Sequence, residues 1–131
     1  KATRLAINDH SCVNAATQYA CIAALDGPQD AAIAMVQAFD ERRRATVAAL
    51  NALPGVSCIE PGGAFYAFPN ISKTGKSAKQ MQNDLIEQAH VATIAGTSFG
   101  AYGEGYLRVS YANSKENILK AIDRIGEYLA G

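Results

Sequence analysis

Residues 103–112, which read Gly-Glu-Gly-Tyr-Leu-Arg-Val-Ser-Tyr-Ala, are the most informative stretch of the sequence. The run from Tyr106 to Tyr111 is rich in aromatic and β-branched residues after a glycine turn, which predicts a strand. Side chains alternate between the two faces of a strand. This alternation predicts two groups on opposite faces, with Tyr106, Arg108 and Ser110 on one, and Leu107, Val109 and Tyr111 on the other.

Arg108 is the candidate functional residue of this strand, because a guanidinium among apolar neighbours needs an anion. Leaving such a charge buried and unpaired costs on the order of several kcal/mol. The planar fork of arginine matches a carboxylate bidentately, which favours a ligand acid group. The residues alone also allow an internal ion pair with Glu104 or another acid, or an arginine that faces water at a sheet edge.

The rest of the sequence predicts helices and short strands in the order helix, helix, strand, strand, helix, strand, strand, helix. Hydrophobic periodicity and capping residues carry these assignments, while the first ten residues show no clear period. The expected helices are Ala15–Leu25 behind a Ser11 or Asn14 cap, Pro28–Leu53, Ala78–Gln88 behind Ser77 with Met81, Leu85 and Ile86 on one face, and a last helix from Ser114 to Leu129. The other expected strands are Val56–Ile59, Ala64–Phe68 and His90–Ile94. This order predicts an α/β (α+β) fold in which a mixed sheet is flanked by helices.

Two of the expected helices are unusual. The helix Ala15–Leu25 is apolar on nearly every side and needs a partner surface. The helix Pro28–Leu53 would be longer than about 35 Å at 1.5 Å per residue, so it either bridges two domains or is a long core helix.

Composition excludes several classes of function. The 131 residues carry 12 basic and 12 acidic side chains, so the positive charge that binding to nucleic acid or to an anionic membrane needs is missing. No apolar segment is long enough to span a membrane. His10 and His90 have no metal-ligand spacing, which argues against a metal site. The three cysteines lack CxxC spacing and predict buried, reduced thiols in a cytoplasmic protein, with a reactive or metal-binding role as the alternative.

Three further motifs allow a functional and a plain structural interpretation. The turn and aromatic strand of residues 61–68 could line a small-molecule pocket or belong to the core. The loop with Gly96, Gly100, Gly103 and Gly105 lacks GxGxxG spacing and leads into a strand, which argues against a nucleotide site. The charged run 40–44 predicts a solvated helix face.

Taken in order, these segments resemble the end of class I/II aminotransferases of pyridoxal-phosphate fold type I. The resemblance runs from about His10 onward, and the ordered series is more specific than any one segment. The matching segments are residues 11–14, 18–20, 24–28, 50–51, 54–55, 61–66 (Pro-Gly-Gly-Ala-Phe-Tyr), 91–92, 96–100 (Gly-Thr-Ser-Phe-Gly) and 103–112, with Met35, Phe39 and Arg42-Arg43 between them.

The resemblance implies roles for particular residues. Arg108 matches the arginine that binds the α-carboxylate of the amino-acid substrate, and Phe65 and Tyr66 would border the substrate cleft. Residues 1–27 would be the end of the large domain near the dimer interface, and residues 28–131 the small domain. The parent protein would be a homodimer that uses pyridoxal phosphate to move an amino group between an amino acid and a 2-oxo acid.

The sequence also departs from the family pattern. The lysine that forms the internal aldimine, the aspartate on the pyridine nitrogen and the phosphate cup lie upstream of this segment in the family, and the residues around Lys1 do not resemble the lysine motif. The chain alone should therefore neither bind pyridoxal phosphate nor transaminate. Related lyases and decarboxylases share this domain, and the preferred amino acid is undetermined. The alternative is a free-standing, non-catalytic α/β domain that binds a small carboxylate or a protein partner.

Overall fold

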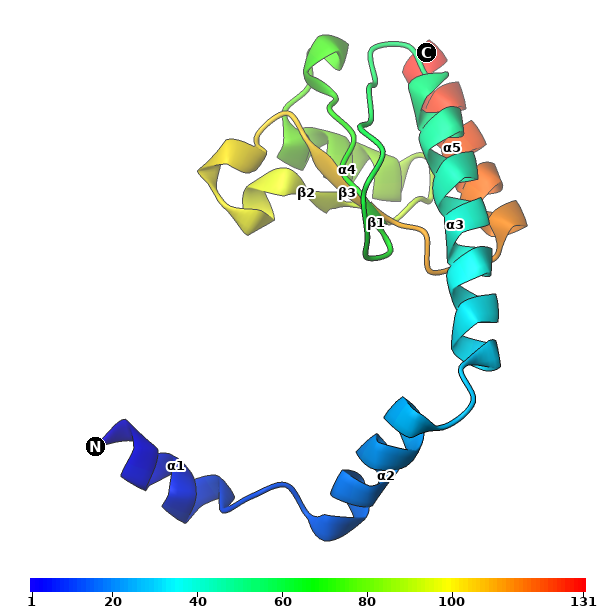
Figure 1. The fold of residues 1–131 in the computed structure, drawn as a ribbon. Coiled ribbons are helices and arrows are strands. Elements are labelled where there is room, and N and C mark those ends of the chain that lie inside the picture. The colour runs from blue at the N-terminus through cyan, green and yellow to red at the C-terminus, as the bar shows by residue number, and fades with distance from the viewer. The chain divides into compact units, whose positions relative to one another are not determined.

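The first helices of the chain bury none of their side chains. The computed structural model describes residues 1–131, which divide into two compact units, Lys1–Met35 and Val36–Gly131. In the first unit, α1 spans Ala2–His10 and α2 spans Ala15–Asp26 (Figure 1). The absence of an element before His10 was a wrong expectation: α1 has no side-chain cap and no buried face, so the sequence carried no signal for it. The Asn14 cap of α2 is confirmed, since its Oδ1 accepts the Thr17 N–H at 2.9 Å.

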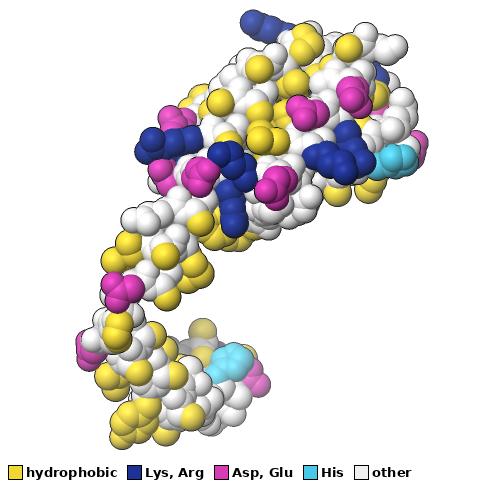
Figure 2. All heavy atoms as spheres, turned by 90° about the vertical axis from the view of Figure 1, so that its right-hand side faces the viewer, with side chains coloured by type: hydrophobic (Ala, Val, Ile, Leu, Met, Phe, Trp, Pro, Cys, Tyr) yellow, Lys and Arg dark blue, Asp and Glu magenta, His cyan; other side chains and the backbone are white.

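Many hydrophobic side chains lie on the surface of this first unit, among polar and backbone atoms (Figure 2). The exposed ones include Leu5, Ile7, Val13, Tyr19, Ile22 and Leu25. Cys12 and Cys21 are exposed as well, so the prediction of buried thiols is wrong for both and holds only for Cys58. The apolar run around Cys21 indicated a core position, but α2 buries none of its side chains. None of the cysteines forms a disulfide.

The long third helix, α3, spans Asp30–Asn51 and begins in the first unit. Its two buried residues, Thr46 and Leu50, lie in its second half, and Phe39 packs against the same core from the middle of the helix. The backbone then turns through Gly55, whose φ of 74° suits glycine. None of the helices in the chain combines the length and the apolar content that crossing a membrane requires.

The second unit is built around a three-stranded sheet in the order β1-β3-β2. The strands are short: β1 is Tyr66–Ala67, β2 is Ile94–Ala95 and β3 is Leu107–Ser110. Both outer strands pair antiparallel with β3. The predicted fold class, a sheet flanked by helices, is confirmed. The expectation of a mixed sheet is wrong, because every pairing is antiparallel. The two outer strands run in the same direction, but β3 lies between them and they do not pair with each other.

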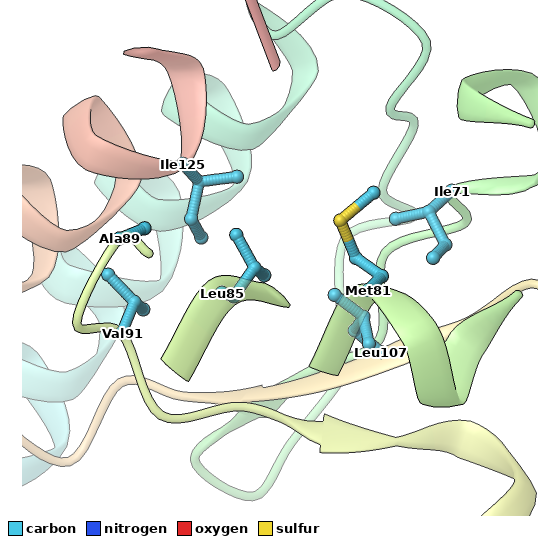
Figure 3. Packing of buried hydrophobic residues seen from close by; sticks show 7 residues of the cluster. All are labelled: Ile71, Met81, Leu85, Ala89, Val91, Leu107 and Ile125. Carbon is cyan, nitrogen blue, oxygen red and sulfur yellow. The ribbon is translucent and has the colours of Figure 1, made fainter. Parts of the chain in front are cut away.

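Helices cover one face of this sheet. The covering helices are α4, Ala78–Glu87, and α5, Lys115–Ala130, together with the second half of α3. Leu107 packs in one cluster with residues of α4 and α5 (Figure 3). The buried members of this cluster are Ile71, Met81, Leu85, Ala89, Val91, Leu107 and Ile125. A second cluster joins α3 and α5 to β1 and contains Leu50, Cys58, Ala67, Tyr111, Ile118 and Ile122.

Local hydrogen bonds replace two of the expected strands. The segment Val56–Ile59 forms only a single bridge, Ser57 with Asn70, because the Asn51 side chain binds both the N–H and the C=O of Cys58. The segment His90–Ile94 is not a strand until its last residue, since the Val91 N–H donates to the Leu85 carbonyl at the end of α4.

The expected apolar face of α4 is only partly correct. Met81 and Leu85 are buried, but Ile86 is 53% exposed. Adjacent side chains of a helix point about 100° apart around its axis, so Leu85 and Ile86 cannot both point into the core.

Candidate functional site

Arg108 lies on the sheet face that the helices leave uncovered. It occupies the central strand β3, opposite Ile94 of β2. Its neighbours Leu107 and Tyr111 are buried at 2% and 1% exposure, whereas Tyr106 and Arg108 are half-buried and Ser110 is exposed. The predicted alternation is confirmed for these residues, whereas Val109, expected on the buried face, is half-buried like Arg108. The structure also overturns the interpretation of an arginine at a sheet edge, because β3 has a partner strand on each side.

No acidic side chain is paired with Arg108. The ion pairs of the chain involve other residues, and no protein acceptor binds the Arg108 guanidinium. The internal pair with Glu104 does not form, because the Glu104 Oε1 accepts the N–H of Ala78 at 2.8 Å and of Gly105 at 3.1 Å. That carboxylate caps the start of α4, where backbone N–H groups lack helical partners. The N–H donors of Arg108 are therefore left for an external anion or water.

Aromatic rings, not acids, surround the Arg108 guanidinium. Its Cζ lies over the Tyr66 ring at 4.3 Å from the centroid and over the Phe99 ring at 4.7 Å. Both distances are within the range of cation–π attraction. Phe99 in turn packs edge-on against Phe68, with 6.5 Å between ring centroids, and Phe68 stacks on Tyr106 at 5.2 Å. The uncovered sheet face thus presents one cation among aromatic groups.

Sequence reasoning missed Phe99. It lies in a 3-10 turn, η2, Gly96–Phe99, which is followed by a second turn, η3, Ala101–Gly103. Neither turn has a repeating hydrophobic pattern that could reveal which way a side chain points. The only hint in the sequence was the glycines near Phe99, which indicated a tightly packed loop.

The two aromatic residues predicted to border the cleft lie in different surroundings. The structure brings Tyr66 to Arg108. Phe65 has no direct contact with Arg108, but its ring packs against Tyr66 with 4.5 Å between the centroids. The Phe65 ring lies 6.2 Å from Phe39 of α3 and lines a cavity of about 470 Å³ that does not include Arg108. Tyr111 lines the same cavity, and its hydroxyl donates to the Ala64 carbonyl at 3.0 Å. Burial raises the pKa of Tyr111, so this hydroxyl stays protonated at neutral pH.

Arg43 of α3 connects this helix to the turn that leads into β1. Arg43 binds Asp40 at 2.5 Å, forms an ion pair with Glu60 and donates to the Pro61 carbonyl at 3.3 Å. The side chain of Arg43 is only 20% exposed, so the expectation of a solvated helix face is wrong for this residue. The reason is its contact with Glu60, which lies 17 residues further along the chain. The Arg43 hydrogen bond lowers the pKa of Asp40.

Two lysines of the second unit are engaged by other side chains of the chain. Lys76 is tied to Asp84 and Tyr128, and Lys115 binds Glu41 at 2.6 Å. The groups identified around Arg108 are aromatic rings and include no amine or carboxylate. No group of three or more His, Cys, Asp and Glu side chains could hold a metal ion.

Known proteins are similar to this chain in sequence. The family described as aminotransferase class I and II matches residues 4–125. An aspartate aminotransferase of Pyrococcus horikoshii is 48% identical over 97 residues, which is 74% of this chain and 25% of that protein. An aspartate aminotransferase of Bacillus sp. YM-2 is 39% identical over 97% of this chain and 33% of its own length.

Solved structures share the fold as well. The aromatic aminotransferase of Pyrococcus horikoshii superposes with a TM-score of 0.90 at 33% identity, over 97% of this chain and 34% of that one. The aspartate aminotransferase of Rhizobium meliloti gives a TM-score of 0.86 at 32% identity, over 94% of this chain and 33% of that one. The chain therefore spans between a quarter and a third of the length of the relatives it matches. With a family match over almost its whole length, the chain belongs to the class I and II aminotransferases.

Proposed function

We propose that Arg108 binds the α-carboxylate of an amino-acid substrate in a pyridoxal-phosphate aminotransferase of which this chain is the carboxyl-terminal part. The observation that carries the proposal is the unpaired guanidinium on a sheet face without acidic contacts. A bidentate pair of charge-assisted hydrogen bonds would satisfy its fork and fix the orientation of the substrate. An amino acid and the corresponding 2-oxo acid share this carboxylate, so one arginine serves both directions of amino-group transfer.

The cofactor and the rest of the active site would come from outside this chain. Residues 1–27 would belong to the large domain near the interface of a homodimer, and residues 28–131 would form the small domain. The exposed apolar side chains of α1 and α2 support this division, because such helices need another surface to bury them. The balanced charge of the chain and its family suit a cytoplasmic enzyme of amino-acid metabolism.

The amino acid itself remains outside the proposal. Relatives named for aspartate and for aromatic amino acids match nearly the same residues of this chain, at 39% and 35% identity. This supports a division of labour in which Arg108 binds the common carboxylate, while residues elsewhere select the side chain.

The test is Arg108→Ala in the full-length protein, with amino-group transfer followed at varied substrate concentration. Loss of a bidentate charged contact should lower kcat/KM by a factor on the order of 100 to 1,000, chiefly through a higher KM. Arg108→Lys should recover only part of this loss, because an ammonium cannot replace the planar fork. Arg44→Ala is the matched control, since its side chain is 71% exposed on α3. Kinetics that do not change in Arg108→Ala would remove this residue from the site. Carboxylate binding without any transfer would favour the non-catalytic alternative.

A further inference from the structure

We propose that Phe99 is a positioning residue that, together with Tyr66, holds the Arg108 guanidinium ready for a carboxylate. This inference rests on the proposed function of Arg108 and adds the groups that orient it. It also gives a role to the loop with Gly96, Gly100, Gly103 and Gly105, whose glycine spacing does not match a nucleotide-binding motif.

The two rings approach Arg108 from different sides. Tyr66 belongs to β1, whereas Phe99 follows β2, and these strands flank β3 on opposite sides. Each ring centroid lies within 5 Å of the guanidinium carbon, at 4.3 and 4.7 Å. Contacts with ring faces do not take up the N–H donors of the guanidinium as an acidic side chain would, so these donors stay free for a carboxylate.

Aromatic contacts suit this task better than an acidic side chain would. A flexible arginine loses rotamer freedom when it binds, so holding it in advance strengthens the binding of its ligand. A resident carboxylate could also hold it, but that group would compete with the carboxylate of the substrate. The rings hold the cation without occupying its hydrogen-bond donors.

Close glycine packing places Phe99 over Arg108. Gly96 and Gly103 lie in contact, so a Cβ on either would overlap the carbonyl oxygen of the other. Gly100 directly follows Phe99 and has a φ of 126°, a conformation that L side chains rarely adopt. The Gly96 N–H also donates to the Tyr106 carbonyl at 2.8 Å, which ties the loop to the start of β3.

Side chains anchor both ends of this loop to α4. Before the loop, the Ala95 N–H donates to Gln82 Oε1 at 2.8 Å. After it, Glu104 accepts from the Ala78 N–H. A loop fixed at both ends and packed through two glycines restricts Phe99 to few positions.

The first experiment measures the order of the Arg108 side chain in the 131-residue chain by the ¹⁵N heteronuclear NOE of its Nε–H group. Phe99→Leu should lower this NOE toward the value of a mobile side chain, and Phe99→Tyr should keep it near the original. Tyr102→Leu is the matched control, because Tyr102 lies on the same loop and is fully exposed. An NOE that stays the same in Phe99→Leu, or that falls equally in Tyr102→Leu, would overturn the proposal.

The second experiment measures kinetics in the full-length protein. Losing one ring should raise the KM for the amino acid about fivefold in Phe99→Leu. The kcat should stay within about twofold, and Phe99→Tyr should restore the KM. Arg108→Ala separates the two proposals. If it raises KM and Phe99→Leu does not, only the role of Phe99 fails; if it has no effect either, the role of Arg108 fails first.

Discussion

Leu85 and Ile86 are adjacent in sequence, and the structure predicts very different consequences for shortening them. Leu85 is completely buried in the cluster beneath the sheet, whereas Ile86 is 53% exposed. A Leu→Ala change at a fully buried site costs about 3 kcal/mol, the sum of lost apolar transfer and the remaining cavity. For Ile86→Ala, roughly half of the area is involved and alanine is the better helix former, so the cost should stay below about 1 kcal/mol.

Thermal and urea unfolding, followed by circular dichroism, check this pair. For a unit of this size, about 3 kcal/mol corresponds to a Tm lower by roughly 12–24 °C, and the Ile86→Ala protein should shift by only a few degrees. The urea m-value should be nearly the same in both variants, because shortening one side chain changes only a small part of the surface exposed on unfolding. Equal losses at the two positions would mean that α4 is rotated about its axis relative to the arrangement described.

Two further properties follow from hydrogen bonds and burial in the second unit. The Lys76 hydrogen bond, followed by that of Tyr128, lowers the pKa of Asp84. The contribution of this carboxylate to stability is therefore complete above its pKa in the unfolded chain, and it is lost as pH falls through the lower pKa of the folded chain. Asp84→Asn should make the free energy of unfolding fall less steeply as pH is lowered. An unchanged slope would contradict this linkage. Burial raises the pKa of Cys58, which should protect it from a thiol reagent at pH 8 until urea unfolds the chain. In the same assay, the exposed thiols of Cys12 and Cys21 should react rapidly. Rapid reaction of a third thiol per chain would refute the buried position of Cys58.

Local capping chemistry made helix starts predictable from the sequence. The Ser77 and Ser114 side chains each accept a backbone N–H three residues further on, as their positions before apolar runs indicated. A cap needs only residues that are close in sequence, so it can be recognised without knowing the fold. The strand carrying Arg108 was predictable for a similar reason, because alternation is a local pattern.

Features that depend on distant residues could not be predicted in this way. Asn51 takes the hydrogen bonds of Cys58 away from a strand, and Arg43 reaches Glu60 across 17 residues. The partner in each case is set by the folded structure and not by spacing along the chain. Phe99 belongs to the same class, because its contact with Arg108 depends on how two turns pack through their glycines.

The two faces of the sheet differ in how far the chain covers them. One face packs on helices and is dry, as Ala67, Ala95 and Leu107 show by their burial. On the other face, Phe68 and Phe99 remain 40% and 54% exposed next to the Arg108 cation. Water weakens the attraction between a guanidinium and a carboxylate, so a tight carboxylate site needs a second wall that excludes it. In the proposed full-length enzyme, protein outside this chain would supply that wall, since the chain spans only 25% and 33% of the relatives compared. Arg108 in this chain alone should therefore bind a simple carboxylate such as acetate far more weakly than the full-length protein binds its substrate. Comparable affinities would show that the uncovered face needs no second wall.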